Sequence, residues 1–222
     1  MSENATREDP QRQDPQRQDP KRQDPKRQDP KRTVKRLTDP RALRALAHPT
    51  RLALVGLLRR EGPLTATRAG ELLGQSSASC SFHLRQLAKY GLVEEAGGGT
   101  GRERPWRATT MFTAWPEVTE DPELAAAGDL FRGVLAERYF EYLNRWLETR
   151  HREPPEWQAA ELFGDTMIYV TAGELAELAR QEQALVDRFL DRQQHPELRP
   201  PGARRVTYLH LAFPGDISGA VE

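Results

Sequence analysis

The segment SASCSFHLRQLAKYGLV, residues 77–93, has the pattern of a short two-sided helix that stops abruptly. At 100° per residue, one face of such a helix carries the side chains of Cys80, Leu84 and Leu87. The opposite face is mostly polar and basic, with one aromatic ring: Ala78, Ser79, Phe82, Arg85, Gln86 and Lys89. Because glycine favours helix ends, Gly91 is expected to end the helix before a strand begins.

An outer face of this composition suits the major groove of DNA. Serine and glutamine side chains can hydrogen-bond base edges or phosphates, arginine pairs with guanine, and an aromatic ring can contact a thymine methyl group. A polar outer face is just as common on an ordinary surface helix, so this helix alone does not distinguish the two interpretations.

The sequence before this segment predicts the rest of a helix-turn-helix. LTATRAGELLG, residues 64–74, predicts a helix capped by Thr65 and ended by Gly74. The linker LLGQSSAS then leads into the next helix, as the turn of a helix-turn-helix does. Two earlier helices are expected over residues 38–48 and 48–62, each with a proline in its first turn.

The sequence after this segment predicts a wing over residues 92–108. GLVEEA and RERPWRA indicate two strands, and GGGTG, residues 97–101, indicates the turn between them. Three basic side chains follow the turn and would contact phosphates or a minor groove: Arg102, Arg104 and Arg107. Three helices followed by a basic hairpin make a winged helix-turn-helix, so the surroundings favour DNA binding.

These residues resemble the ArsR-type winged helix-turn-helix transcriptional regulators. The resemblance rests on ALAHPTRLALVGLL, LTATRAGELLG, SCSFHLRQLAKYGLV and the arginine-bearing hairpin, and it covers residues 38–108. It implies a homodimeric transcription factor, usually a repressor, that binds operator DNA with a recognition helix over residues 77–90. Metal-sensing members carry paired cysteines in the preceding helix, whereas ATRAGELLG has no cysteine or histidine. The resemblance therefore implies no metal site, and no cofactor is expected.

The DNA-binding residues predicted on this basis are Ser77, Ser79, Phe82, His83, Arg85, Gln86, Lys89, Arg102, Arg104 and Arg107. His83 lies beside the apolar face, so a packing histidine and a phosphate contact are both open interpretations. Cys80 is the only cysteine, and its place on the apolar face predicts a buried core residue rather than a sensor.

Charge is distributed unevenly along the 222 residues, although the net charge is zero. Residues 1–32 carry 9 basic and 7 acidic side chains, a net +2. Residues 33–108 carry 13 and 6, a net +7, and residues 109–222 carry 11 and 20, a net −9. A basic middle segment favours a polyanionic partner, so double-stranded DNA is the expected partner of that segment and not of the acidic half.

The sequence divides into three parts. Residues 1–32 contain a five-residue QRQDP or KRQDP repeat with almost no apolar side chains, which predicts a disordered tail. A nucleic-acid-binding arm is the alternative for this tail, although each repeat adds an aspartate to its basic residues. Residues 33–110 are expected to form the winged helix-turn-helix, and residues 111–222 a dimerisation and effector module.

Residues 122–150 give the strongest helical pattern in the chain, with one broad apolar stripe. A stripe this long exceeds what a small winged helix can cover, so it could pair with its copy in a homodimer or cover the C-terminal module. Pairing in a homodimer is the first expectation. The predicted dimerisation residues are Phe131, Leu135, Tyr139, Tyr142, Leu143, Trp146 and Leu147.

A small strand-helix-strand module is expected after this helix. DTMIYVT, residues 165–171, and RRVTYLHLAF, residues 204–213, predict strands, and TAGE, residues 171–174, predicts a capping box that opens a helix to about Arg192. The fold class is therefore α+β and mainly α. Five aromatic residues could line a pocket for an apolar small-molecule effector or form plain core: Trp146, Trp157, Phe163, Tyr169 and Phe213.

Several function classes are not indicated. The sequence contains no nucleophile elbow, phosphate loop, zinc signature or paired acid–base carboxylates, so we expect no enzyme. The longest apolar run, Leu52–Leu58, is too short to cross a bilayer, and the N-terminus lacks the pattern of a signal peptide. We therefore expect a cytoplasmic protein without a membrane partner. A winged helix that binds another protein instead of DNA is the alternative function.

Overall fold

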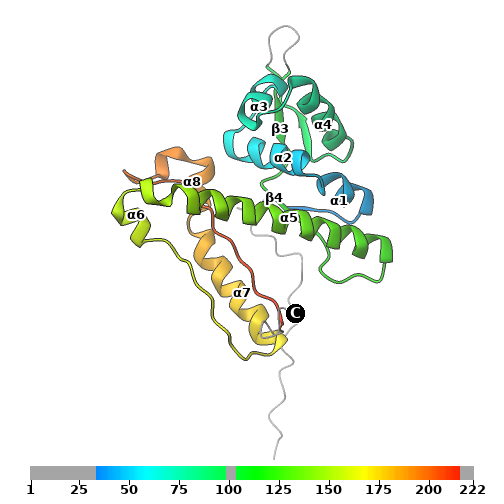
Figure 1. Ribbon diagram of the computed structural model, residues 1–222. Helices are drawn as coiled ribbons and strands as arrows, with labels where there is room; N and C mark the ends of the chain where they lie inside the picture. Colours follow the sequence, from blue (N-terminus) through cyan, green and yellow to red (C-terminus); the bar gives the residue numbers. More distant parts are fainter. Residues whose placement is uncertain (1–33, 99–103, 216–222) are drawn as a thin grey trace, which may run out of the picture. The chain divides into compact units, whose positions relative to one another are not determined.

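The computed structural model describes residues 34–98 and 104–215 (Figure 1). The predicted tail over residues 1–32 lies outside these ranges. Four helices and a two-stranded hairpin follow one another in the order that the sequence predicts: α1 (Pro40–Leu46), α2 (Pro49–Glu61), α3 (Ala66–Leu73), α4 (Ser77–Lys89), β2 (Val93–Glu95) and β3 (Trp106–Ala108).

The first and third of these helices begin at side-chain caps, and Thr65 is the cap that the sequence predicts for the third. The side chain of Asp39 accepts a hydrogen bond from the Arg41 backbone N–H at 2.8 Å, and Pro40 occupies the first helical turn. Thr65 Oγ1 accepts from the Arg68 backbone N–H at 3.1 Å. Each cap satisfies a backbone donor that the helix leaves unpaired, so the short helices start at defined residues.

The hairpin of β2 and β3 is antiparallel, with Val93 opposite Ala108 and Glu94 opposite Arg107. A third segment adds to this small sheet, because Leu64 exchanges two backbone hydrogen bonds with Trp106, at 3.0 and 2.8 Å. The three segments close one side of the winged helix, and Trp106 is buried there.

A second sheet was not predicted from the sequence. β1 (Val34–Arg36) pairs in parallel with β4 (Phe112–Ala114), across the predicted domain boundary at residue 110. Arg59 of α2 holds the start of β4, because its guanidinium donates to the Thr110 carbonyl oxygen at 2.9 Å and to Thr113 Oγ1 at 2.6 Å. Burial lowers the pKa of Arg59 to about 10, so the side chain keeps its charge at neutral pH.

One hydrophobic core joins the winged helix to the first half of α5 (Pro122–Thr149), which has 28 residues and ends one residue before the predicted range of 122–150. Leu124 and Ala127 of α5 are buried in this core, and the rings of Trp115 and Phe131 meet edge to face at 4.9 Å. Phe131 is only 2% exposed. Phe131 is therefore a core residue of its own chain, which corrects its prediction as a dimer contact.

Short helices follow α5 along the chain: η1 (Arg150–Arg152), α6 (Pro155–Ala159), α7 (Ala172–Asp187), α8 (Asp191–Gln194) and η2 (Pro196–Leu198). The predicted capping box at the start of α7 is present, with Thr171 and Glu174 bonded reciprocally at 2.8 and 3.2 Å. α7 ends at Asp187, a few residues before the predicted end at Arg192. In the part of the chain that is described, no helix is long and apolar enough to span a bilayer.

The two strands predicted around α7 are wrong for the single chain. The structure assigns no strand to residues 165–171 or 204–213, although both run as extended chain (Figure 1). A strand needs a neighbour to pair its backbone, and neither segment meets one among the described residues. The fold class of a mainly helical α+β protein is confirmed, with two small two-stranded sheets.

Candidate nucleic-acid interface

The turn between α3 and α4 fixes how α4 lies on the domain. α3 ends at Gly74, whose φ of +64° is a left-handed conformation that glycine adopts without strain. A Cβ atom at Gly70 would lie 2.6 Å from the Gln75 carbonyl oxygen, so the close approach of the turn to α3 requires glycine. Ser76 then caps α4 by accepting a hydrogen bond from the Ser79 backbone N–H at 3.1 Å.

The predicted inner face of α4 is buried. Cys80, Leu84 and Leu87 are all fully inaccessible and belong to the core cluster. Burial raises the pKa of the Cys80 thiol, which keeps the thiol protonated and unreactive at neutral pH. The core interpretation of Cys80 is therefore confirmed, and α4 is anchored along its whole length.

The outer face of α4 remains open. The side chains of Ser77, Phe82, Arg85 and Lys89 are exposed, and those of Ser79 and Gln86 are half-buried. Phe82 is 50% exposed, so its ring is accessible on the outer face. The Arg85 guanidinium donates a hydrogen bond to Ser81 Oγ at 2.9 Å, one helical turn away. Arg85 is thereby oriented on the outer face.

Two polar residues, one on α4 and one on the neighbouring α3, were not identified from the sequence. Ser81 orients Arg85, and its spacing of four residues from Arg85 was the signal that could have identified it. Thr67 of α3 lies 3.2 Å from Ser77, hydroxyl oxygen to hydroxyl oxygen. The first turns of α3 and α4 are therefore adjacent, and their backbone N–H groups favour a negatively charged ligand such as phosphate.

His83 lies between the inner and outer faces. Its ring centroid is 4.7 Å from that of His48 and 5.3 Å from that of Phe82. The Nδ1 atoms of His48 and His83 are buried, and neither has a hydrogen-bond partner among the described residues. Burial lowers the pKa of both imidazoles, with a further contribution from the positive charge of Arg51. Of the two interpretations left open, this environment favours packing over a phosphate contact.

The wing presents its arginines already paired with carboxylates. Arg104 donates to Glu95 at 2.9 Å, and Arg107 donates to Glu94 at 2.8 Å, while all four side chains are exposed. Arg102 lies in residues 99–103, outside the described residues, as does the tip of the wing. Exposed ion pairs are weak, so phosphates can compete for Arg104 and Arg107.

Some of the positive charge of residues 33–108 serves the fold instead of the surface. Lys35 donates to the Gly91 carbonyl oxygen at 2.6 Å, next to the end of α4. Arg51 donates to the carbonyl oxygens of Ala45 and Arg44 in α1. Together with the half-buried Arg59, these cations stabilise the domain, whereas Arg85 and Lys89 of α4 and the described arginines of the wing are exposed.

The remaining predicted dimerisation residues lie on the second half of α5. Leu147 is 49% exposed, and the other five are half-buried: Leu135, Tyr139, Tyr142, Leu143 and Trp146. Trp146 donates from Nε1 to Glu161 at 2.8 Å, and Arg138 stacks on the ring of Tyr142 at 5.1 Å. Part of the stripe is therefore covered by polar side chains of the same chain.

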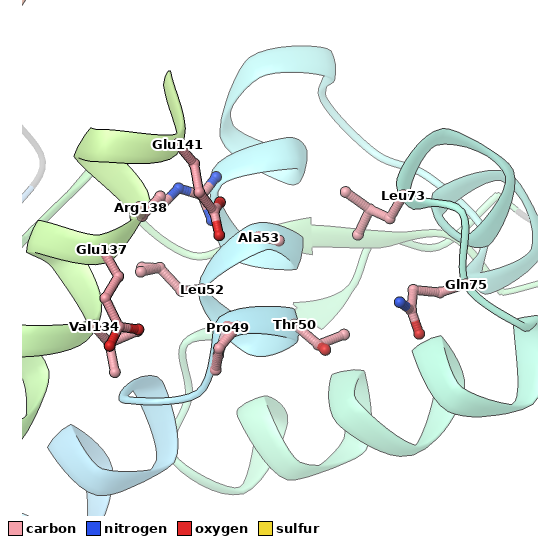
Figure 2. A pocket seen from close by; sticks show the side chains of 10 residues that line it. All are labelled: Pro49, Thr50, Leu52, Ala53, Leu73, Gln75, Val134, Glu137, Arg138 and Glu141. Carbon is pink, nitrogen blue, oxygen red and sulfur yellow. The ribbon is translucent and has the colours of Figure 1, made fainter. Parts of the chain in front are cut away.

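A shallow pocket of about 350 Å³ lies between α5 and the turn that joins α3 to α4 (Figure 2). The lining residues come from α2, α5, the end of α3 and the turn after it: Pro49, Thr50, Leu52, Ala53, Leu73, Gln75, Val134, Glu137, Arg138 and Glu141. None of the five aromatic residues named for an effector pocket is among them. Phe163, Tyr169 and Phe213 are exposed, so they form neither the predicted pocket nor plain core within the single chain.

Residues 46–96 match a family model described as a helix-turn-helix domain. The matched range includes all of α2, α3, α4 and β2. No curated protein sequence matches the chain. The match confirms the predicted helix-turn-helix, a regulatory domain rather than a catalytic one, and supports a DNA-binding regulator.

Proposed function

We propose that the chain is a homodimeric transcriptional regulator of the ArsR type, a repressor that binds operator DNA. In this proposal α4 enters the major groove, where its outer side chains contact base edges and the first turn contacts phosphates. The wing of residues 92–108 holds phosphates or the adjacent minor groove through Arg102, Arg104 and Arg107.

The exposed outer face of α4 is the observation that carries the proposal. Arg85 is oriented there by Ser81 and is free to donate to a base edge. Phe82 is half-exposed beside it and can contact a thymine methyl group. Because Leu84 and Leu87 anchor the inner face, the outer side chains would enter a groove on a rigid helix.

Two copies of the chain are proposed to act together. The second half of α5 supplies the contact through Leu135, Tyr139, Tyr142, Leu143, Trp146 and Leu147. A two-fold dimer would present two α4 helices to successive major grooves, with half-site centres roughly 34 Å apart. The proposed operator is therefore a pseudo-palindrome of two half-sites.

An unidentified small molecule is proposed as the effector, and the pocket beside α5 supports this. A ligand there would contact α5 and also Gln75, which lies just before α4. On its α5 side Glu137 and Glu141 outnumber Arg138, and this net negative charge favours a ligand with positive charge. Such a ligand would link the proposed dimer helix to the start of the DNA-contacting helix.

The test begins by identifying bound sites with genome-wide footprinting. Affinity is then measured by fluorescence anisotropy for one such site and for a random duplex of equal length, between low and moderate salt. We expect tighter binding to the identified site and a linear fall of log affinity with log salt, because phosphate contacts release counterions. Equal, weak binding to both duplexes would contradict the proposal and favour a protein-binding winged helix.

A further inference from the structure

The C-terminal half of the chain lacks a core of its own. None of the residues 132–215 whose exposure the structure describes is buried, and Phe131 is the last buried residue before them. α7 has only 16 residues, and an isolated helix of that length is marginally stable in water. This half of the molecule therefore needs a partner surface to be stable.

The apolar surface is concentrated in two extended segments, residues 162–170 and 206–213. Tyr169 is the extreme case, with a side chain as accessible as in an unfolded peptide at 105%. The exposed apolar residues of the two segments are Leu162, Phe163, Met167, Ile168, Tyr169, Val170, Val206, Tyr208, Leu211 and Phe213. This many exposed apolar residues in so short a length marks an interaction surface.

The backbone of both segments is unpaired as well. No backbone hydrogen bond joins either segment to another part of the chain that the structure describes. Their composition of β-branched and aromatic residues is typical of strands. Side chains fix one of them along α7, because Tyr208 donates to Glu182 at 3.0 Å and His210 lies 3.1 Å from the same carboxylate (Figure 1).

We propose that residues 162–170 and 206–213 are β-strands that pair with the same segments of a second copy of this chain. The two copies together then form one intermolecular sheet, which buries the exposed apolar side chains of both. This rests on the homodimer proposed above and adds a second contact surface to α5. The strands that the sequence predicts would thus exist only in the dimer.

Area and charge favour a second copy as the occupant. Each large apolar or aromatic side chain can bury roughly 100–250 Å², so ten of them reach the roughly 800 Å² per partner of a stable interface. Residues 109–222 carry a net charge of −9, which would repel a second copy. The two segments carry little of this charge, because Asp165 is the only acidic or basic side chain of residues 162–170 and His210 is the only one of residues 206–213.

Hydrogen exchange of the full-length protein tests the pairing. Exchange is followed at protein concentrations tenfold below and tenfold above the dimer dissociation constant, which light scattering supplies. We expect amides of residues 162–170 and 206–213 to exchange at least about 10-fold more slowly in the dimer. The amides of α2 serve as the internal control, with the same rate at both concentrations. Equal rates for the two segments at both concentrations would overturn the inference.

A charged pair of substitutions gives an independent result. Tyr169→Asp with Leu211→Asp should raise the dimer dissociation constant about 10-fold or more, because an interface cannot bury the new carboxylates. The control, Val118→Asp with Leu198→Asp, adds the same charges at exposed apolar positions outside the segments. Circular dichroism verifies that both variants keep their helices. A wild type that is monomeric at every concentration would overturn the homodimer as well, whereas a dimer with unprotected segments would overturn only this inference.

Discussion

Single residues on the two sides of α4 have separate roles. Leu84 and Cys80 are fully buried and hold the helix, whereas Arg85 is exposed and oriented by Ser81. Substitutions of the inner residues should therefore change stability, and substitutions of Arg85 should change recognition.

Leu84→Ala should lower the free energy of unfolding by about 2–5 kcal/mol, because it leaves a cavity in the core. Cys80→Val should be nearly neutral for stability and for DNA affinity, since valine has a similar volume and the thiol makes no essential bond. Urea unfolding measures the free energy of unfolding of both variants, and fluorescence anisotropy measures their DNA affinity. A large loss of DNA affinity in a folded Cys80→Val would show that this face contacts DNA.

The imidazoles of His48 and His83 should make the fold sensitive to acid. Burial lowers the pKa of both below the ordinary value of 6.5, and each imidazole is also disfavoured as a cation by Arg51. At pH values between the folded and unfolded pKa, the unfolded chain binds more protons. Stability is therefore complete above about pH 6.5 and is lost as the pH falls through the folded pKa values.

Urea unfolding between about pH 8 and pH 5 measures this loss. A variant with His48→Gln and His83→Gln should show a flatter dependence over the same range, because it lacks both titrating groups. A wild type that gains stability as the pH falls from 7 to 5 would contradict this account of the pair.

At the scale of elements, the ion pairs of the wing compete with phosphate for its arginines. Glu94 and Glu95 pair with Arg107 and Arg104, so binding to phosphate requires each arginine to exchange its partner. Glu94→Gln with Glu95→Gln should raise the affinity for specific and random DNA alike, by roughly 10-fold at low salt, and steepen the salt dependence.

Anisotropy titrations over a range of salt concentrations measure both effects. The control removes the same two charges outside the winged helix, with Glu156→Gln and Glu177→Gln, and should raise the affinity much less. An unchanged affinity in the wing variant would show that β2 and β3 do not approach DNA.

The second half of α5 should hold the dimer. Leu143→Asp with Leu147→Asp places two carboxylates on the stripe, and we expect roughly 100-fold weaker dimerisation, because a buried unpaired charge costs several kcal/mol. Light scattering and analytical ultracentrifugation measure the mass. The control, Ala126→Asp with Asn144→Asp, places the charges at exposed positions of the same helix that are not among the predicted dimerisation residues. A folded stripe variant that stays dimeric would place the interface elsewhere.

The winged helix could be predicted because its signals are local. Thr65 and Gly74 bound α3 through their own side chain and backbone, and the spacing of Cys80, Leu84 and Leu87 defines the inner face of α4. By contrast, the sequence does not show which surface packs on each part of the apolar stripe of α5. Phe131 was therefore assigned to a dimer although it packs on Trp115.

Pairings between segments far apart in the chain could not be predicted from the sequence, because the sequence does not specify which segments meet. β1 and β4 are three residues each and pair across almost 80 intervening positions, so neither has a recognisable pattern alone. Conversely, residues 165–171 and 204–213 have the composition of strands but no neighbour in the described chain. Composition predicts that a segment can form a β-strand, but the neighbouring strand is known only from the fold or the assembly.

The molecule as a whole separates charge between its two parts. The segment of residues 33–108 has a net charge of +7 and carries the helix-turn-helix, while residues 109–222 carry −9. A net positive charge attracts phosphate and a net negative charge repels it, so the charge distribution favours the proposed DNA contact through the first part. In the proposed dimer, the acidic half contacts a second copy through its apolar side chains, against the repulsion of its net charge.

The most direct test of base recognition by α4 is the ratio of affinities for the identified site and for random DNA, measured for Arg85→Ala beside Arg104→Ala. We predict that Arg85→Ala lowers the affinity for the specific site by about 1–3 kcal/mol, with much less effect on random DNA. Arg104→Ala should weaken both similarly and reduce the salt slope by roughly one charge. An unchanged ratio in Arg85→Ala, with the variant folded, would contradict the account.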